Sequence, residues 1–410
     1  MKIVSMTMVG NESEIIESFV RYNSNFVDEM LLIMSGSVDN TLQIIEKLIE
    51  EGYPIILKDE SLLSYEQRYV ENKYLRYLAN LEDVDLIVPL DADEFIFSKE
   101  ENPRDILEKL SLNRVYKTAW KSYVMHPEDD INEKFIPKRI RYCKKVENPL
   151  ITKVIVPAKL VRNKKIFLET GRHDVCGEAV EVEFLENIQV THYPTISVEQ
   201  YQSKLYCSSI NFITWMNRGN GEGGHINKQI AELENSNDIY KCATGYGLGE
   251  QDKDNIIEEP LLLNFCDNTR LEIKYGNLAK VDLQKNLIAI GQLSAIRAYN
   301  LEIEKLFDNE NETILIYGAG GDTQNLFNGL PQNIVNIRAY VDSNPEKKFM
   351  MYNRRLVITP DLVRFFKYDK IVISSKKYYS EMKEMLKKNR VEEDKICTVE
   401  HLFALYDELR

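Results

Sequence analysis

Three carboxylates, those of Asp91, Asp93 and Glu94, stand within four residues at the end of the apolar run 86–90. Carboxylates this close repel one another, and they lose solvation when they follow a buried strand. A divalent cation with oxygen ligands usually relieves that repulsion, and the cation is often shared with a phosphate-bearing substrate. The pattern therefore indicates that Asp91 and Asp93 bind a metal ion and a diphosphate. The alternative is an acidic loop without a ligand, since Asp-x-Asp occurs often by chance.

The elements that would position these acids can be read from the alternation of apolar runs with helical periodicity. We predict strands at 2–9, 29–34, 53–57 and 84–90, and helices at about 14–20, 40–51 and 64–80. Asn11 and Ser13 are expected to cap the first helix. Strands that alternate with helices predict an α/β fold with a largely parallel, doubly wound sheet. In such a sheet the polar loops at 10–12, 35–41 and 91–94 line up along one edge, where ligands bind.

Several segments resemble a known family. Val-Gly-Asn-Glu at 9–12, Ser-Val-Asp-Asn-Thr at 37–41 and Asp-Ala-Asp-Glu-Phe at 91–95 resemble the family 2 glycosyltransferases, which have the GT-A (Rossmann-like) fold. More narrowly, the chain resembles a bacterial branch related to family 92. The matches to that branch are Lys-Val-Ile-Val-Pro at 153–157, a histidine at 173, and the segment 191–204, which runs from Thr-His-Tyr-Pro to Lys204.

This resemblance covers roughly residues 1 to 210 and implies a metal-dependent glycosyltransferase that uses Mn²⁺ or Mg²⁺. It implies transfer of a hexosyl or N-acetylhexosaminyl group, with inversion, from a nucleotide sugar to a hydroxyl of a protein or glycan. A surface or flagellar protein is one such acceptor. A UDP-sugar is favoured as the donor. The sequence departs from family 2 at Met34, where these enzymes commonly carry an acid near the nucleotide base.

Site residues follow from the same resemblance and from the acid cluster. The residues expected to bind the donor are Asn11, Glu12, Asp39, Asp91, Asp93, Lys153 and His173. Asp91, Asp93 and His192 are expected to hold the metal, and a structural, hydrogen-bonded role is the alternative for His192. Inversion by direct displacement needs a base that accepts the proton of the acceptor hydroxyl. Asp174 and Glu178, in the loop after the strand at 153–157, are the candidates.

The second half of the chain has a different character. Residues 309–410 resemble the Rossmann-like modules found beside many sugar-processing enzymes, with strands at 313–317, 337–342 and 370–374 and helices at 322–329 and 378–389. Thr323 stands where the Gly-x-G-x-x-G fingerprint that starts at Gly318 has its last glycine. Asp342 would meet a ribose hydroxyl or simply form a turn. The intervening region, 211–308, is expected to be mostly helical and to serve the acceptor or as a linker.

Composition sets the outer limits. The chain has 410 residues, enough for two or three domains, and a formal net charge of −13, which argues against general nucleic-acid binding. Its six cysteines form no Cys-x-x-Cys pair, which favours reduced thiols. We expect no transmembrane segment, a cytoplasmic location and a possible homo-oligomer. Two other classes stay open: a nucleotide-sugar-modifying enzyme that uses 309–410, and a non-catalytic scaffold for glycan assembly.

Overall fold

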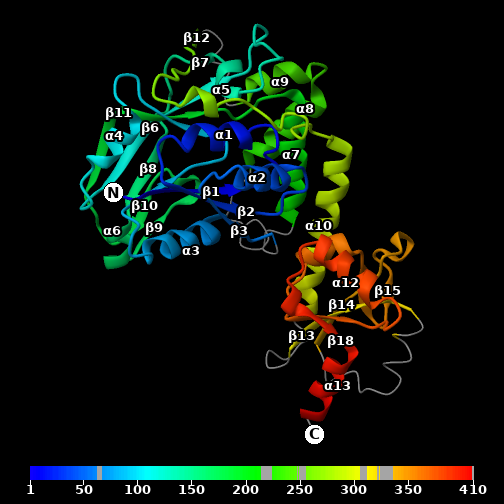
Figure 1. The fold of residues 1–410 in the computed structure, drawn as a ribbon. Helices are drawn as coiled ribbons and strands as arrows, with labels where there is room; N and C mark the ends of the chain where they lie inside the picture. Colours follow the sequence, from blue (N-terminus) through cyan, green and yellow to red (C-terminus); the bar gives the residue numbers. More distant parts are fainter. Residues whose placement is uncertain are drawn as a thin grey trace. The chain divides into compact units, whose positions relative to one another are not determined.

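The computed structural model describes residues 1–61, 67–213, 224–246, 248, 255–304, 312–320, 323 and 336–408 (Figure 1). The chain forms two compact units, Met1–Gly291 and Gln292–Arg410. The division falls inside the segment 211–308, which the sequence predicts as a separate helical region. Most of the predicted helix at 322–329 and the start of the predicted domain at 309 lie outside the described residues.

Four parallel strands form one end of the sheet in the first unit. Their order is β3 (Ile55–Asp59), β2 (Glu29–Met34), β1 (Ile3–Val9) and β4 (Leu86–Pro89). Side chains alternate between the faces, so Ile3 belongs to the core on one side and Val4 and Met6 to the core on the other. The predicted parallel α/β arrangement of this region is confirmed, and the loops after β1, β2 and β4 share one edge.

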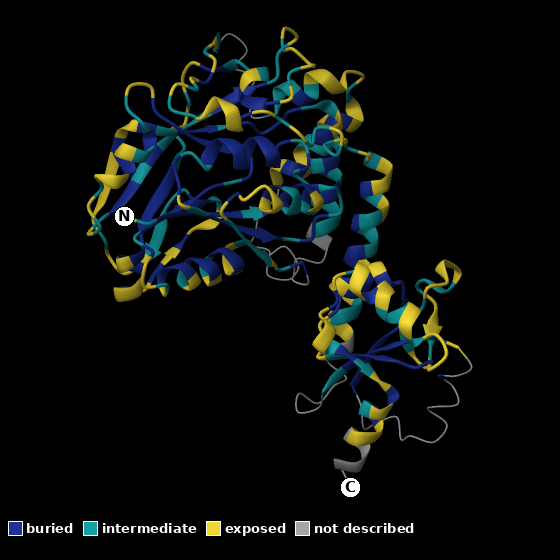
Figure 2. Cartoon of the chain, viewed as in Figure 1, coloured by how far each residue is buried: buried dark blue, intermediate teal, exposed yellow. Residues whose placement is uncertain are grey.

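Helices cover both faces of these strands. α1 (Ile16–Asn23) and α2 (Thr41–Glu50) share a core with one face, and α3 (Gln67–Ala79) and α6 (Ala158–Asn163) share a core with the other. Every residue of α1 is buried, as Figure 2 shows. The reason is that other backbone also packs on this helix: Glu17 accepts hydrogen bonds from the backbone nitrogens of Lys274 and Tyr275, at 2.8 and 2.9 Å.

The loop after β1 is built differently from the prediction. α1 begins without a side-chain cap, so the expected capping by Asn11 and Ser13 is wrong. Asn11 instead adopts a φ of 57°, which asparagine tolerates better than most residues. Its Oδ1 accepts hydrogen bonds from the backbone nitrogens of Val38 and Asp39, at 2.8 and 3.3 Å. The loops after β1 and β2 are therefore joined directly.

Beyond β4 the sheet becomes mixed. The next strands are β8 (Thr152–Pro157), β6 (Val115–Val124), β7 (Tyr142–Lys144) and β12 (Ile256–Glu258), each antiparallel to the one before. β11 (Val182–His192) pairs in parallel with β6 and antiparallel with β5 (Glu94–Phe97). In this register His192 is opposite Glu94. A strand from far along the chain thus brings a histidine to the acid cluster.

The second edge of β5 is occupied by a side chain. Asn23, the last residue of α1, donates through Nδ2 to the carbonyl of Glu94 and accepts through Oδ1 from the backbone nitrogen of Ile96, both at 3.0 Å. Both groups of Asn23 are buried. The side chain therefore makes the two hydrogen bonds that a neighbouring strand would make.

A cluster of helices follows the sheet. α7 (Val198–Ile213), α8 (Gly224–Asn235) and α9 (Ile239–Gly245) pack around Tyr201, Leu205, Ile226, Leu233 and Ala243. The remaining elements of the unit are α4 (Pro103–Glu108), α5 (Ile136–Arg139), β9 (Ile166–Leu168), β10 (Val175–Gly177), and 3₁₀ turns at Thr170–Arg172 and Asn268–Arg270.

The second unit is a smaller α/β fold. Its sheet has the order β15 (Met351–Tyr352), β16 (Arg355–Ile358), β14 (Asn336–Val341), β13 (Thr313–Tyr317), β17 (Lys370–Ile373) and β18 (Ile396–Thr398), parallel except for β15. Its helices are the second part of α10 (Leu283–Glu304), α12 (Tyr379–Lys388) and α13 (Val399–Glu408), with 3₁₀ turns at Pro345–Lys347, Pro360–Phe365 and Glu393–Lys395. The predicted strands and the predicted helix at 378–389 are confirmed.

Thr323, which stands in place of the last fingerprint glycine, stabilises the turn after β13 through hydrogen bonds. The Thr323 hydroxyl donates to the carbonyl of Gly318 at 2.6 Å and lies 2.8 Å from the Ser374 hydroxyl. Gly318 has a φ of 120°, and a Cβ there would meet Ser374 Oγ at 2.2 Å. Asp342 pairs with Lys347 at 2.7 Å. The Asp342–Lys347 pair fits the alternative in which Asp342 forms a turn. No helix in the described part of the chain is long and apolar enough to cross a bilayer.

Candidate active site

A cavity of about 500 Å³ lies at the carboxyl ends of β1, β2 and β4. The predicted convergence of the loops after these strands is confirmed, because all three contribute to its wall. The strand-end loops supply Asn11, Glu12, Gly36, Asp91 and Asp93, and β11 supplies His192. The opposite wall comes from the helical cluster, through Gln200, Lys204, Asn211, His225 and Tyr246.

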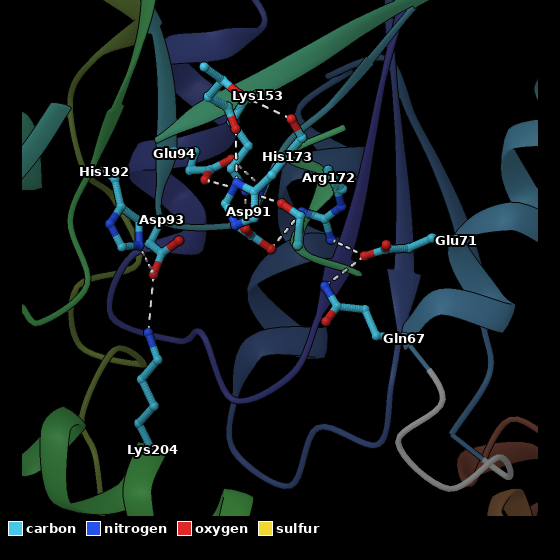
Figure 3. A network of polar contacts seen from close by, with 12 residues as sticks. Gln67, Glu71, Asp91, Asp93, Glu94, Lys153, Arg172, His173, His192 and Lys204 are labelled. Carbon is cyan, nitrogen blue, oxygen red and sulfur yellow. Dashed lines mark hydrogen bonds and ion pairs between the residues drawn. The ribbon is translucent and has the colours of Figure 1, made fainter. Parts of the chain in front are cut away.

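Asp93 is the acid that faces the cavity together with a histidine and a lysine (Figure 3). Its Oδ2 lies 3.5 Å from His192 Nε2 and 3.2 Å from Lys204 Nζ. Burial alone would raise the pKa of Asp93, but Lys204 and His192 hold it well below its usual range. Burial likewise opposes the charge of Lys204, and Asp93 raises the pKa of that lysine above its usual value. Asp93 is therefore a carboxylate at neutral pH.

Asp91 points the other way, into a buried group of charges (Figure 3). Its Oδ2 pairs with Lys153 Nζ at 2.7 Å and its Oδ1 with Arg172 Nη1 at 2.5 Å. The Lys153 and Arg172 side chains are 2% and 0% exposed, against 33% for Asp91. Burial disfavours the ionised form of Asp91, but Arg172 and Lys153 lower its pKa well below the usual value.

Two further acids complete this buried group. Lys153 Nζ also contacts Glu94 Oε1 at 2.8 Å and donates to the carbonyl of Gly171 at 2.9 Å. Arg172 also pairs with Glu71 from α3. Each buried cation is thus matched by two carboxylates, which is what charges removed from water require. Gln67, which lines the cavity, bonds Glu71 at 2.8 Å and connects the group to the open space.

Several polar atoms in the cavity wall have no hydrogen-bond partner among the described residues. They are Glu12 Oε2, His192 Nδ1 and Gln200 Oε1, and each is buried. A buried polar atom left unpaired costs free energy, so natural sites seldom contain several together. Burial raises the pKa of Glu12 well above its usual value; Lys204 opposes that shift and Asp93 adds to it. The wall is therefore built to receive a polar molecule.

Fit to a metal ion differs between the two aspartates. The described residues contain no group of three or more His, Cys, Asp or Glu side chains that could hold a metal. Both oxygens of Asp91 pair with buried cations, so Asp91 offers a metal ion no oxygen that is free of a cationic partner, and its role as a ligand stays a prediction. Asp93 Oδ2 and His192 Nε2, 3.5 Å apart, fit two neighbouring ligands each about 2 Å from one ion. Mg²⁺ commonly takes one or two protein ligands and completes its shell with substrate phosphates and water.

The other predicted site residues lie outside the cavity wall. Asp39 bonds the backbone nitrogens of Ser13 and Thr41, at 3.1 and 3.0 Å, and so holds two loops together. Lys153 pairs with Asp91 and does not line the cavity. His173 stacks on Trp120 at 5.6 Å between ring centres, and its Nδ1 lies 2.8 Å from the carbonyl of Thr152.

Neither predicted base reaches the cavity. Asp174 pairs with Lys117 at 2.5 Å, and the Glu178 carboxylate accepts from the backbone nitrogen of Lys165 at 3.0 Å. Both residues belong to the surface around β9 and β10, and neither is among the residues that line the cavity. Neither acid is therefore placed to accept a proton from a hydroxyl that lies in this cavity.

Sequence reasoning gave no role to three side chains that shape the site: Arg172, Lys204 and His225. Arg172 carried no signal beyond its position beside His173. Lys204 belongs to the segment that resembles the family 92 branch, so a signal existed for it. His225 follows a glycine-rich run at 219–224 and carried no sequence signal of its own.

One family profile and a number of solved structures match parts of the chain. A family profile described as "C2185-like, N-terminal" matches residues 310–397, inside the second unit. No curated protein matches the chain.

Several solved structures are similar at low scores. S. aureus TarS is 15% identical, with a TM-score of 0.32, and the match covers 75% of this chain and 50% of TarS. A glucosyl-3-phosphoglycerate synthase from Mycobacterium tuberculosis, in complex with Mn²⁺ and UDP, is 21% identical, with a TM-score of 0.21 over 29% of this chain and 44% of that one. HddC from Yersinia pseudotuberculosis is 12% identical, with a TM-score of 0.29 over 49% and 96%. TM-scores in this range carry no argument about the fold or the activity.

Proposed function

We propose that the chain is a metal-dependent glycosyltransferase that takes its sugar from a nucleotide-sugar donor. The observation that carries the proposal is the Asp93–His192 pair in the wall of a polar cavity at the ends of parallel strands. A carboxylate oxygen and an imidazole nitrogen that face the same open space suit a divalent cation such as Mn²⁺, which can be shared with a diphosphate. The order of motifs along residues 1–210, which resembles the family 2 enzymes, supports the same reaction class.

The reaction places negative charge where the site holds positive charge. As the glycosidic bond of the donor breaks, charge develops on the leaving nucleoside diphosphate. A divalent cation bound to Asp93 and His192 would offset that charge as a Lewis acid. Lys204 supplies a second positive charge in the cavity wall, and a fixed charge in a water-poor site acts more strongly than one in water. Asn11, Glu12 and Gly36 form the part of the wall that would hold the nucleoside.

Asp91 has a supporting task in this scheme. By pairing with Lys153 and Arg172, it fixes the turn between β4 and β5 against a buried framework. Asp93 leaves the same turn, so its direction into the cavity depends on that framework. Precise placement of such a ligand matters because small displacements of a reacting group lower the rate strongly.

The base for an inverting reaction must come from the cavity wall. Glu12, Asp93 and His192 stand on the side of the strand ends, which we assign to the donor. His225 stands on the other side, on α8. His225 is exposed, but partial desolvation of its ring and, secondarily, the charge of Lys204 lower its pKa below the ordinary value, which favours the neutral imidazole that can accept a proton. We assign His225 as the base in place of Asp174 and Glu178.

Donor hydrolysis tests the function without knowledge of the acceptor. The purified chain is incubated with a panel of UDP-, GDP-, CDP- and dTDP-sugars and Mn²⁺, and release of the nucleoside diphosphate is measured. We expect slow release from one donor class, UDP-sugars first, and loss of release in EDTA that added Mn²⁺ restores. A folded chain that neither hydrolyses any donor nor binds any nucleoside diphosphate contradicts the proposal.

A further inference from the structure

Two nitrogen groups converge on one oxygen in the candidate active site. Lys204 Nζ and His192 Nε2 both face Oδ2 of Asp93, at 3.2 and 3.5 Å (Figure 3). The same oxygen and the same histidine nitrogen are the pair that fits a divalent cation. An ammonium group therefore stands next to the oxygen that such a cation would use.

We propose that Lys204 holds the place of the divalent cation in the donor-free site and releases Asp93 when the cation arrives with the diphosphate. This inference rests on the proposed function. A divalent cation on Asp93 Oδ2 would lie within a few ångströms of the Lys204 ammonium, and the two positive charges would repel. The phosphates of the donor then offer the ammonium a new anionic partner in the same cavity.

The contacts of the two lysines near the acid cluster show why Lys204 is the one that moves. Lys153 Nζ has three close acceptors, in Asp91, Glu94 and Gly171, at 2.7 to 2.9 Å. Lys204 Nζ has two longer contacts, to Asp93 at 3.2 Å and to the carbonyl of Pro194 at 3.1 Å. Lys204 also lines the cavity, whereas Lys153 does not. A flexible four-carbon stem lets such an ammonium change partners without backbone movement.

A coupling between two ligands follows. The cation alone must displace Lys204 from Asp93, whereas the cation with a diphosphate gives Lys204 a replacement. Each ligand should therefore raise the affinity of the site for the other by the same factor. Removal of the ammonium should strengthen binding of the cation alone and weaken the coupling.

The test measures binding of Mn²⁺ to the full chain by electron paramagnetic resonance, with no donor and no turnover. Lys204→Met and Lys204→Gln each remove the charge, and two variants guard against a folding defect in one. We expect each to bind Mn²⁺ about tenfold more tightly than the unaltered chain, which corresponds to about 1.4 kcal/mol. Added to Lys204→Met, Asp93→Asn should abolish that gain. Lys121→Met is the matched control, because it removes a lysine that pairs with Glu259 outside the cavity wall and should give no gain.

The second arm repeats the titration with saturating UDP, GDP, CDP or dTDP. In the unaltered chain the diphosphate should raise the affinity for Mn²⁺, and in the Lys204 variants this increase should be smaller. Folded Lys204 variants that bind a diphosphate but show no gain in Mn²⁺ affinity would overturn the role of Lys204 alone. If neither the unaltered chain nor any variant binds a diphosphate, the proposed function is overturned. The proposed release of Asp93 by Lys204 then fails with it.

Discussion

Asp91 and Asp93 are two residues apart and carry the same functional group, but their surroundings differ. Asp91 neutralises two cations that are almost completely buried, and Asp93 shares one oxygen with a histidine and a lysine at the cavity wall. Replacement of Asp91 and replacement of Asp93 should therefore have different effects, although both residues belong to the same Asp-x-Asp motif.

Asp93→Asn should lose the metal with a smaller loss of stability than Asp91→Asn, because Asp93 pairs with one lysine and Asp91 with two almost completely buried cations. The second change leaves Lys153 and Arg172 each short of a partner inside the protein, and the expected loss is about 3 kcal/mol, since breaking a buried pair costs roughly 3 to 5 kcal/mol. Urea denaturation gives the free energy of unfolding, and Mn²⁺ titration gives the metal affinity. Equal loss of stability in the two variants would contradict this assignment.

Glu12→Gln should stabilise the protein at neutral pH and not in acid. Burial raises the pKa of Glu12 in the folded state. Its carboxyl therefore stabilises the fold fully below the unfolded pKa, near 4.3, and that contribution is lost as the pH rises through the folded pKa. Glutamine does not titrate, so the advantage of the variant should grow from pH 4.5 upward to roughly 1 kcal/mol or more. Thermal unfolding from pH 4.5 to 8 measures it, and a difference independent of pH would contradict the burial of this carboxyl.

At the scale of elements, the turn Thr170–Arg172 carries the buried arginine to Asp91. Gly171 and Arg172 both have positive φ angles, 78° and 59°. A Cβ on Gly171 would lie 2.7 Å from His173 Nε2, and that ring is held by Trp120 and by the carbonyl of Thr152. The turn therefore needs glycine for both its backbone angle and its space.

Gly171→Ala should destabilise the protein by about 2 to 3 kcal/mol and weaken donor binding, because backbone strain of this kind costs about 1 to 3 kcal/mol before any clash. Gly52→Ala is the matched control: Gly52 has a φ of 88°, but a Cβ there meets nothing within 4 Å. The control should show the backbone strain alone and unaltered donor binding. Thermal unfolding and diphosphate titration of both variants separate the two effects. A similar loss of stability in both variants would show that the His173 ring moves away from the added Cβ at little cost in free energy.

The central elements were predictable from the sequence, and the charge partners were not. Apolar runs that end in polar loops are local signals, so β1, β2 and β4 and the acids after them could be placed. The partners of those acids lie far along the chain: Arg172 is 81 residues from Asp91, and Lys204 is 111 residues from Asp93. Pairing at such a distance depends on the order of β8, β11 and α7 in space, which local periodicity does not contain. For the same reason, the position of Asp174 near a matched motif does not show whether its side chain reaches the cavity.

At the scale of the whole molecule, the candidate site belongs to the first unit. Every described residue of the cavity wall lies before Gly291, where the first compact unit ends. The second unit has its own sheet and its own hydrophobic core. Its Thr323 and Asp342 are engaged in local contacts, and neither residue lines the candidate site of the first unit.

A chain ending at Glu304 should keep diphosphate binding and donor hydrolysis. That truncation retains all of α10 and removes the second sheet. Calorimetric titration with the diphosphate that the full chain binds measures retention, and circular dichroism shows whether the truncated chain is folded. A folded chain that has lost donor binding would place part of the donor site in the second unit.

The side chain of Asn23 has a consequence for how copies of the molecule behave at high concentration. An unpaired strand edge is a template for intermolecular pairing and aggregation. Among the described strands, β5 pairs only with β11, and Asn23 occupies the carbonyl of Glu94 and the amide of Ile96 on the remaining edge. The buried side-chain amide of Asn23 therefore satisfies an otherwise unpaired strand edge directly after Asp93, the candidate metal ligand. The two backbone groups are thereby satisfied within the molecule, so the strand that follows Asp93 offers neither of them to another chain.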